Sequence, residues 1–326
     1  MTRELRDSSV QLRLIGDLSA TTSSSLVLLV VQGLSDVLHF LNTSEIASSN
    51  ARVAFYALSR EDCNNPDGPR LAEDARVAFG FVPYGDCGFV DGDRFSVIPL
   101  GPSYEHGFPL NAHKLPLPDV DSRPYLLNLM VSWTPEKPTR MQALMAAEHI
   151  CGLDGSRCII EHGSLMFKVL QLLDNAVGSS LRWRLSSAPQ TYFDNLRQSV
   201  FTLCPMGKNP EQYRIWEALA AGSIPIIEDM PALEPGTFWH PAYPKTWRCV
   251  REDIHGFLKR MGAPVIFVSD WQRDLPRVLA HYTQDHPDEL LRLQRRVRRW
   301  YRQQGEHLQA ELLAKLVAHS RSDSLK

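Results

Sequence analysis

Apolar residues fall into short runs that alternate with segments in which they recur every three or four positions. This alternation is typical of βα units, in which helices cover both faces of a mostly parallel sheet. In the first part of the chain it predicts strands at residues 26–31, 53–58, 77–82 and 95–100, and a helix at residues 35–41. The sequence therefore predicts an α/β fold with doubly wound, Rossmann-like halves.

A proline-rich segment interrupts this pattern. Six prolines lie between residues 99 and 124, which is typical of a connection between domains rather than of a core. Beyond it, the pattern predicts strands at residues 125–131, 181–185, 201–204, 224–227 and 265–268, and helices at residues 139–150 and 190–198. Apolar residues beyond residue 270 are spaced for one helix face, so we expect C-terminal helices that pack across both halves.

Chain length agrees with two cores. The chain has 326 residues, and one hydrophobic core usually serves a domain of about 150 residues. The expected domains are an N-terminal Rossmann-like domain at residues 1–122, a second Rossmann-like domain at residues 123–270, and C-terminal helices at residues 271–326.

Composition weakens the case for nucleic acid or membrane partners. The formal net charge is -2, so the chain lacks the bulk positive field that nucleic-acid binding usually uses. The arginine-rich run at residues 292–302 lies in a helix pattern with acidic residues nearby, and we interpret it as a solvated helix face. The apolar run at residues 26–31 is far shorter than the ~20 residues that span a bilayer. We therefore expect no nucleic acid partner and no membrane anchor in this chain.

One stretch, PMGKNPEQYRIWEALAAGSIP at residues 205–225, has the signals of a helix with a defined start and end. Asn209 is a good N-cap, Pro210 suits the first helical position, and Gln212 can reach back from the third. Gly222 supplies the left-handed residue that ends a helix. The sequence thus predicts a helix from about residue 210 to residue 221.

The residues around this helix start have the chemistry of an anion site. A strand at residues 201–204 leads into the loop, and open α/β sheets bind ligands beyond the carboxyl ends of their strands. Free N–H groups at a helix start attract anions, and Lys208 stands beside them. Arg214 could hold a diphosphate, and Glu217 could accept hydrogen bonds from a ribose diol. The alternative is that Arg214 and Glu217 form only a surface ion pair at the i, i+3 spacing.

Several segments together resemble the donor-binding half of the exostosin-like (GT47-type) glycosyltransferases, and within them most the ribitol-5-phosphate xylosyltransferases. The resemblance covers about residues 26–310 and is strong only from residue 123 onward. It rests on FTLCPMG at 201–207, YRIWEA at 213–218, GSIPIIED at 222–229, RPYLLN at 123–128, FLKRMGAPVIFV at 257–268, RWY at 299–301 and, more loosely, PLG at 99–101.

The resemblance implies a GT-B fold, in which the N-terminal domain faces the acceptor and the second domain binds the nucleotide sugar. It implies inverting transfer of xylose from UDP-xylose, without a required cofactor, to a glycan or glycoprotein acceptor such as ribitol-5-phosphate in the O-mannosyl glycan of α-dystroglycan. Family members are anchored in the Golgi membrane, so the resemblance implies the Golgi lumen and membrane contact only through an anchor absent here. An exostosin-like transferase with another UDP-sugar and a catalytically silent glycan-binding scaffold are the alternatives.

The site residues implied by the resemblance and the loop are assigned by role. The donor-binding set is Gly207, Lys208, Asn209, Tyr213, Arg214, Glu217, Glu228 and Asp229. Arg214 is also expected to act in catalysis by holding the departing diphosphate. An inverting transfer needs a base for the acceptor hydroxyl, and the candidates are Asp36, His39, Asp86 and His106, of which we favour Asp36 and His106.

Metal-binding patterns are weak. Two D-x-D pairs, Asp91 with Asp93 and Asp119 with Asp121, match the Mn²⁺-binding pairs of GT-A glycosyltransferases, but each is short enough to occur by chance. A zinc site could use His149, Cys151, Cys158 and His162, although their spacing fits no standard zinc pattern. We therefore expect no metal. The six cysteines show neither a redox motif nor the density of a disulfide scaffold.

Overall fold

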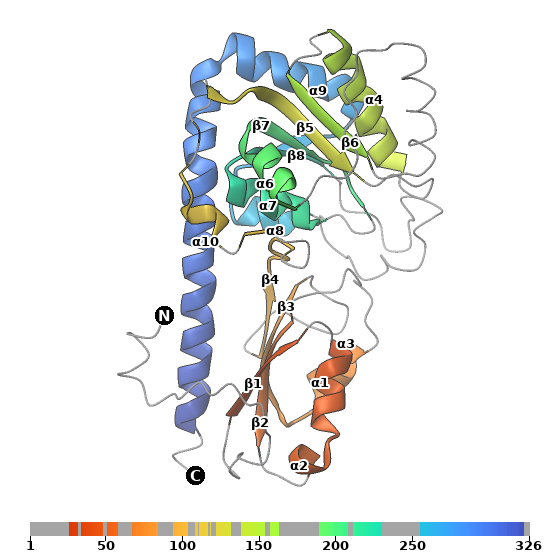
Figure 1. The fold of residues 1–326 in the computed structure, drawn as a ribbon. Coiled ribbons are helices and arrows are strands. Elements are labelled where there is room, and N and C mark those ends of the chain that lie inside the picture. The colour runs from red at the N-terminus through yellow and green to blue at the C-terminus, as the bar shows by residue number, and fades with distance from the viewer. Residues whose placement is uncertain are drawn as a thin grey trace. The chain divides into compact units, whose positions relative to one another are not determined.

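The computed structural model describes much of the chain (Figure 1). The described residues are 26–31, 34–47, 51–57, 67–83, 94–103, 108–109, 111–116, 118, 122–131, 138–153, 157–162, 189–207, 211–229 and 255–322. They form two compact units. Among the described residues, the first unit holds those up to Leu100 and those from Gln304 onward, and the second holds those from Gly101 to Gln303. The domain bounds expected from the sequence stay a prediction.

The first unit has a parallel sheet of four strands in the order β1-β2-β3-β4. Its elements are β1 (Leu26–Val31), α1 (Leu34–Leu41), α2 (Ser44–Ala47), β2 (Arg52–Ala57), α3 (Asp67–Glu73), β3 (Val77–Pro83) and β4 (Phe95–Ile98). Every crossover steps to the next strand in the same direction. Because parallel crossovers are right-handed, the connecting helices must lie on one face of the sheet, and Figure 1 shows α1 and α3 side by side there.

The opposite face of this sheet is covered by the end of the longest helix, α10 (Pro287–Ser322). Leu308, Leu312 and Leu316 repeat every four residues and pack against a cluster in the sheet, which comprises Ala54, Ala78, Phe79, Phe81 and Ile98. Ser96 Oγ on β4 donates a hydrogen bond to Glu311 Oε1 at 2.6 Å. The last turns of α10 therefore take the place of the helices that the sequential strand order cannot supply.

The second unit has a parallel sheet of five strands in the order β6-β5-β7-β8-β9. The strands are β5 (Tyr125–Val131), β6 (Cys158–His162), β7 (Ser199–Cys204), β8 (Ile224–Glu228) and β9 (Ile266–Val268). The helices are η4 (Ala112–Lys114), α4 (Pro138–Leu153), α6 (Pro189–Arg197), α7 (Tyr213–Ala221), α8 (Gly256–Arg260), α9 (Trp271–Ala280), the π-helical turn η6 (His281–Asp285) and the first part of α10.

Strand order reverses in this sheet between β5 and β7. The chain passes from β5 to β6 on one side and then returns to β7 on the other. Right-handed crossovers in opposite directions place their helices on opposite faces, and α4 packs with α9 whereas α6 packs with α7. Loops that leave β5 and β7 therefore diverge, and doubly wound sheets bind ligands at such a reversal of strand order.

A buried polar chain joins the strands at this reversal. Asn128 Nδ2 on β5 donates to Phe201 O at 3.2 Å and to Thr202 Oγ1 at 2.8 Å on β7. Thr202 Oγ1 in turn lies 2.7 Å from Ser223 Oγ, just before β8. Buried polar groups are costly unless they are hydrogen-bonded, so these three side chains favour one register of β5, β7 and β8.

The α/β prediction is confirmed, and most expected strands are present with shifts of one or two residues. Two predictions about elements need correction. Strand β6 was not predicted, and α7 begins at Tyr213 rather than near residue 210. Gln212 has the extended backbone of the N-cap and its Nε2 donates to Pro205 O. The predicted strand at residues 181–185 lies outside the described residues.

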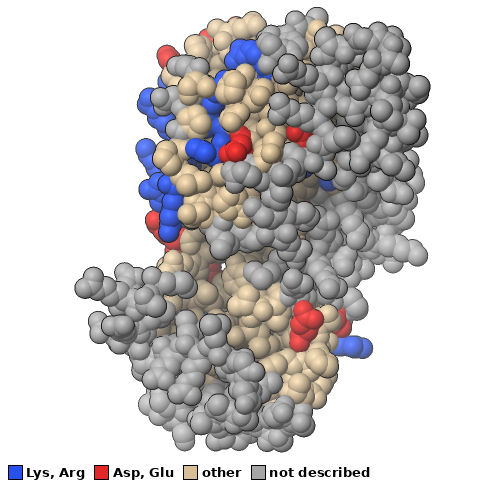
Figure 2. Space-filling model, in the orientation of Figure 1, with Lys and Arg blue, Asp and Glu red and all other residues tan. Residues whose placement is uncertain are grey.

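Figure 2 shows basic side chains gathered on the surface along α10. Between residues 291 and 302 every exposed residue is an arginine, and the intervening apolar residues Val297 and Trp300 are buried. The structure therefore places the exposed arginines of this run on the surface of α10, and their interpretation as a merely solvated face stays a prediction. No described helix is long and apolar enough to cross a membrane.

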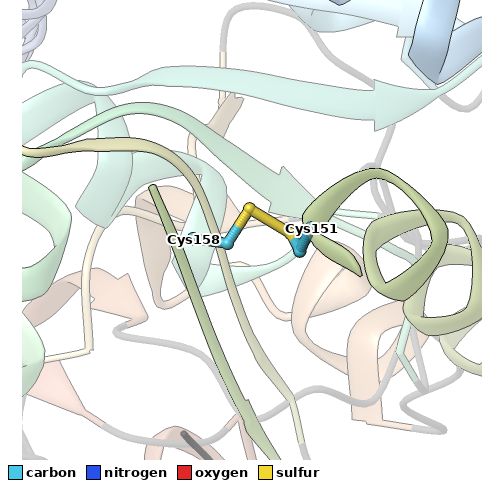
Figure 3. The surroundings of a disulfide bond; sticks show 2 residues. All are labelled: Cys151 and Cys158. Carbon is cyan, nitrogen blue, oxygen red and sulfur yellow. A yellow bond between two sulfur atoms is a disulfide. The ribbon is translucent and has the colours of Figure 1, made fainter. Parts of the chain in front are cut away.

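A disulfide joins the end of α4 to the start of β6, between Cys151 and Cys158 (Figure 3). It spans the short connection between this helix and this strand, and the two cysteines have a sequence separation of 7. The sequence analysis did not pair these cysteines. Because both sulfurs are bonded to each other, they cannot serve as the thiolate ligands of the zinc site that the spacing left open.

Candidate functional site

The loop that follows β7 is held between two neighbouring elements. Met206 O accepts hydrogen bonds from Thr139 Oγ1 and Arg140 Nε, both at 3.2 Å, in the first turn of α4. Met206 N donates to Glu228 Oε2 at 3.2 Å, at the carboxyl end of β8. The loop thus lies at the carboxyl edge of the sheet beside the reversal of strand order, where the sequence analysis placed an anion site.

The guanidinium of Arg140 lies against the backbone of Gly207. A Cβ at this position would collide with Arg140 Nη2, and Gly207 itself is buried. Arg140 therefore brings a positive charge to the loop. The sequence analysis missed Arg140, although its place in the first turn of a helix that follows a strand was a usable signal.

Arg214, on the first turn of α7, is the second cation of the site. Its guanidinium carbon lies 5.9 Å from the ring centroid of Tyr192 on α6, and its Nε donates to Tyr192 Oη at a long 3.5 Å. Burial opposes charge on Arg214, but Tyr192, Cys204 and Glu217 hold its pKa above the ordinary value. Arg214 forms no ion pair within the described part of the chain.

Glu217, one helical turn further along α7, is buried, with 5% of its surface exposed. Its Oε2 accepts a hydrogen bond of 2.5 Å from Tyr192 Oη, and its Oε1 accepts one of 3.1 Å from Ser103 N. Burial, followed by the charge of Glu217, raises the pKa of Tyr192, so the phenol stays protonated. The side chains of Arg214 and Glu217 are linked through Tyr192, and the alternative of a surface ion pair is wrong.

Glu228, at the end of β8, is the acidic residue that contacts the loop after β7. Its Oε1 accepts a hydrogen bond of 2.8 Å from Trp271 Nε1, at the start of α9. Burial raises the pKa of Glu228, while the hydrogen bonds from Trp271, Met206 and Thr139 act against that rise. The next residue, Asp229, forms an ion pair with Lys259 on α8. Glu228 thus contacts the loop, whereas Asp229 faces a neighbouring helix.

The structure brings part of the expected site together. Gly207 and Glu228 meet through Met206, and Arg214 and Glu217 meet through Tyr192. Tyr213 is the first residue of α7 and is partly exposed. Lys208, Asn209, Asp86 and His106 lie outside the described residues. Asp36 and His39 are exposed on α1 in the first unit, and their catalytic roles stay predictions.

Residues that sequence reasoning missed are those that act through tertiary contacts. Tyr192, Ser103 and Trp271 come from three separate segments and contact Glu217 or Glu228. No local motif marks them. Both D-x-D pairs lie outside the described residues. Among the described residues, no group of three or more His, Cys, Asp or Glu side chains is placed to hold a metal ion.

Comparison with known proteins gives a partial match in the C-terminal part of the chain. The model of the "RXYLT1 C-terminal domain" family matches residues 177–320, which is less than half of the chain. Human ribitol-5-phosphate xylosyltransferase 1 is 34% identical over 133 residues, which are 39% of this chain and 26% of that protein. A probable glucuronosyltransferase of rice, GUT1, is 46% identical over 39 residues, which are 12% of this chain and 9% of that protein.

Comparison of folds covers more of the chain. The crystal structure of TarM aligns with 89% of this chain and 54% of its own, with a TM-score of 0.50 and 12% sequence identity. At such a low sequence identity, the similarity shows a shared fold and not a shared function. The parallel sheet in each of the two units agrees with this fold. The chain thus has the GT-B fold of glycosyltransferases, and its C-terminal part is similar to the ribitol-5-phosphate xylosyltransferases.

Proposed function

We propose that the protein is a glycosyltransferase that binds a UDP-sugar at the reversal of strand order in the second unit. The donor is UDP-xylose, and the acceptor is a glycan such as ribitol-5-phosphate in an O-mannosyl glycan. The donor and the acceptor are carried over from the relatives, which the matched segment covers only to about a quarter of their length.

The observation that carries the proposal is that the positive charge of Arg214 is weakly compensated by the described residues around it. Arg214 is partly buried, and withdrawal of a guanidinium from water costs free energy unless an anion or hydrogen-bond acceptors compensate it. Arg214 has an aromatic ring and one long hydrogen bond, and no carboxylate pairs with it among the described residues. Arg140 adds a second guanidinium, which contacts the loop at Met206 and Gly207. Two guanidinium groups flanking a loop at the carboxyl edge of a parallel sheet suit a diphosphate.

In the proposed reaction the acceptor hydroxyl attacks the anomeric carbon of the donor and UDP departs. Negative charge develops on the leaving diphosphate, so cations fixed in advance stabilise the transition state more than the ground state. Arg214 and Arg140 supply that charge in our proposal, and Glu217 accepts hydrogen bonds from the ribose. The bonds from Tyr192 and Ser103 orient the Glu217 carboxylate for this role. Asp36 and His106 remain the candidate bases.

Donor choice tests the proposal directly. Ligand that binds only the native state raises the unfolding temperature by mass action. We expect UDP-xylose to raise it more than UDP-glucose or UDP-N-acetylglucosamine, because a pocket fitted to xylose excludes the exocyclic group of a hexose. The Arg214→Ala variant should lose the effect of all three. Equal stabilisation by all three donors would remove the xylosyl specificity, and no stabilisation by any would remove the donor site.

A second candidate function is an exostosin-like transferase with an acidic donor. The 39-residue match to a probable glucuronosyltransferase favours it. UDP-glucuronate therefore belongs in the same series of donors, and stronger stabilisation by it than by UDP-xylose would support this candidate. We also propose that no metal is required, because two guanidinium groups can neutralise the diphosphate. Activity should survive excess EDTA, and a loss that Mn²⁺ restores would contradict this.

An oxidising compartment fits the proposal. The Cys151–Cys158 disulfide is of the kind that persists in secretory compartments and is rare in the cytosol. The relatives are glycosyltransferases, and we propose the Golgi lumen as the location.

A further inference from the structure

The exposed side of α10 in the second unit carries an uninterrupted line of arginines. Arg292, Arg295, Arg299 and Arg302 are spaced by three or four residues, so they lie on one side of the helix. We call these four residues the arginine face. It spans ten residues, or about 15 Å at the rise of an α-helix. The run from residue 292 to residue 302 contains no lysine and no acidic residue.

Three of these four arginines have no acidic partner among the residues that the structure describes. Arg292 lies 3.9 Å from Glu289, at the limit of an ion pair, and its side chain is 68% exposed. Arg295, Arg299 and Arg302 form no ion pair with any residue that the structure describes. Surface arginines usually alternate with acids when their role is solubility. Four successive positions of one sign, in a chain of net charge -2, instead form a local positive surface.

Further arginines extend the positive charge beside this face. Arg298 Nη2 donates to Leu115 O, and Arg197 Nη2 donates to Pro116 O at 2.6 Å. Burial lowers the pKa of Arg298, and the nearby charges of Arg302 and Arg197 add to this. Repulsion of this kind costs stability, and a bound polyanion would relieve it.

The helix that carries the face is firmly anchored in the second unit. Trp300 stacks on Trp216 with ring centroids 6.0 Å apart, and its Nε1 donates to Met261 O at 2.8 Å. Val297 is fully buried. Arginines on such an element lose less conformational freedom on binding than arginines on a loop.

We propose that the arginine face of α10 binds a segment of an acidic glycan chain, apart from the donor site. Guanidinium groups match sulfate, phosphate and carboxylate oxygens in a bidentate way, and ammonium groups do not. The choice of a glycan rests on the proposed function. A membrane surface is disfavoured because the exposed residues between 291 and 302 include no apolar side chain to insert. The length of the face suits a short run of charges.

Binding of a heparin-derived octasaccharide, measured by isothermal titration with the full chain and without donor, tests the proposal. We expect the Arg295→Gln/Arg299→Gln/Arg302→Gln variant to bind at least about tenfold more weakly, with a smaller dependence on salt. A control with the same charge, Arg70→Gln/Arg157→Gln/Arg277→Gln, replaces exposed cations away from this helix and should change affinity less than about twofold. Replacement of the three arginines by lysine should weaken binding to an intermediate degree.

The outcomes separate the proposal from its alternatives and from the proposed function. Equal loss in the control variant, or no binding at all, would overturn it. So would tighter binding of a DNA duplex of the same charge, or of phosphatidylserine vesicles, through the same arginines. Arg214→Ala should keep octasaccharide binding, so loss of donor binding alone would leave the arginine face intact. Circular dichroism of each variant confirms that the helix is retained.

Discussion

The two units contain parallel sheets that differ in how the chain visits their strands. In the first, β1 to β4 follow one another in order, and the helices connecting them lie on one face. In the second, the order reverses between β5 and β7. Only a reversal makes neighbouring loops diverge at the carboxyl edge. Among the described residues, the buried polar chain and the two guanidinium groups occur at that reversal.

The same difference explains how each sheet is covered. The reversal places α4 on one face of the second sheet and α6 and α7 on the other. The described connecting helices of the first sheet lie on one face, and the end of α10 covers the other face through Leu308, Leu312 and Leu316. Topology therefore determines both where a ligand crevice can form and which face needs a helix from elsewhere in the chain.

The largest effect is expected from removal of this cover. Leu316→Ala deletes a side chain that is 4% exposed and packs on Phe79 and Phe81, and such changes cost about 2–5 kcal/mol. Native-state hydrogen exchange should quicken in β2 and β3 and remain unchanged in β7 and β8. Gln309→Ala, an exposed position of the same helix, is the control. Equal quickening in both sheets would show that the units do not unfold separately.

An intermediate effect is expected at the reversal. Arg214→Ala should lower turnover by on the order of 10²-fold or more, because the arginine's hydrogen bonds strengthen as the leaving group gains charge. Arg214→Lys should recover only part of the activity, since an ammonium lacks the planar fork. Glu217→Gln should mainly weaken UDP binding. Arg277→Ala, an exposed arginine on α9, should change neither quantity. Unchanged UDP affinity in both the Arg214→Ala and the Glu217→Gln variants would defeat the donor-site assignment.

The smallest effect is a pH dependence at Glu228. Burial raises the pKa of this carboxyl above its ordinary value of 4.5, so the folded state holds the proton more tightly than the unfolded state. Below 4.5 both states are protonated and the group costs nothing. As the pH rises from there through the folded-state pKa, the folded state loses stability. The stability of the wild type relative to Glu228→Gln should therefore fall over this range, measured by urea unfolding. Parallel curves would contradict the raised pKa.

Much of the fold could be predicted from the sequence. Strands such as 26–31 and 125–131 are marked by compact apolar runs, and Gly222 ends α7 with a left-handed backbone, φ 78°. These signals are local, because an apolar run and a left-handed glycine depend on few neighbours. The start of α7 was misplaced because Gln212 uses its side chain on Pro205 O, a contact with the preceding loop that no local rule contains.

The candidate site divides in the same way. Arg214, Glu217 and the loop at Gly207 could be found from their order along the chain, since all follow one strand. The sequence could not show that Tyr192 joins Arg214 to Glu217, or that Arg140 lies against Gly207. Those contacts exist only because β5 and β7 are neighbours in the sheet and α6 packs on α7.

The sequence by itself determined the alternation of strands and helices, the end of α7 and the residue types of the candidate anion site, because each depends on neighbours within a few positions. Tertiary structure alone decided the strand order, the Cys151–Cys158 bond, the burial of Glu217 and the arginine that flanks Gly207. Each of these features depends on contacts between separate segments of the chain, which no local pattern of residues predicts. Only the packing of both sheets with their helices brings those segments together.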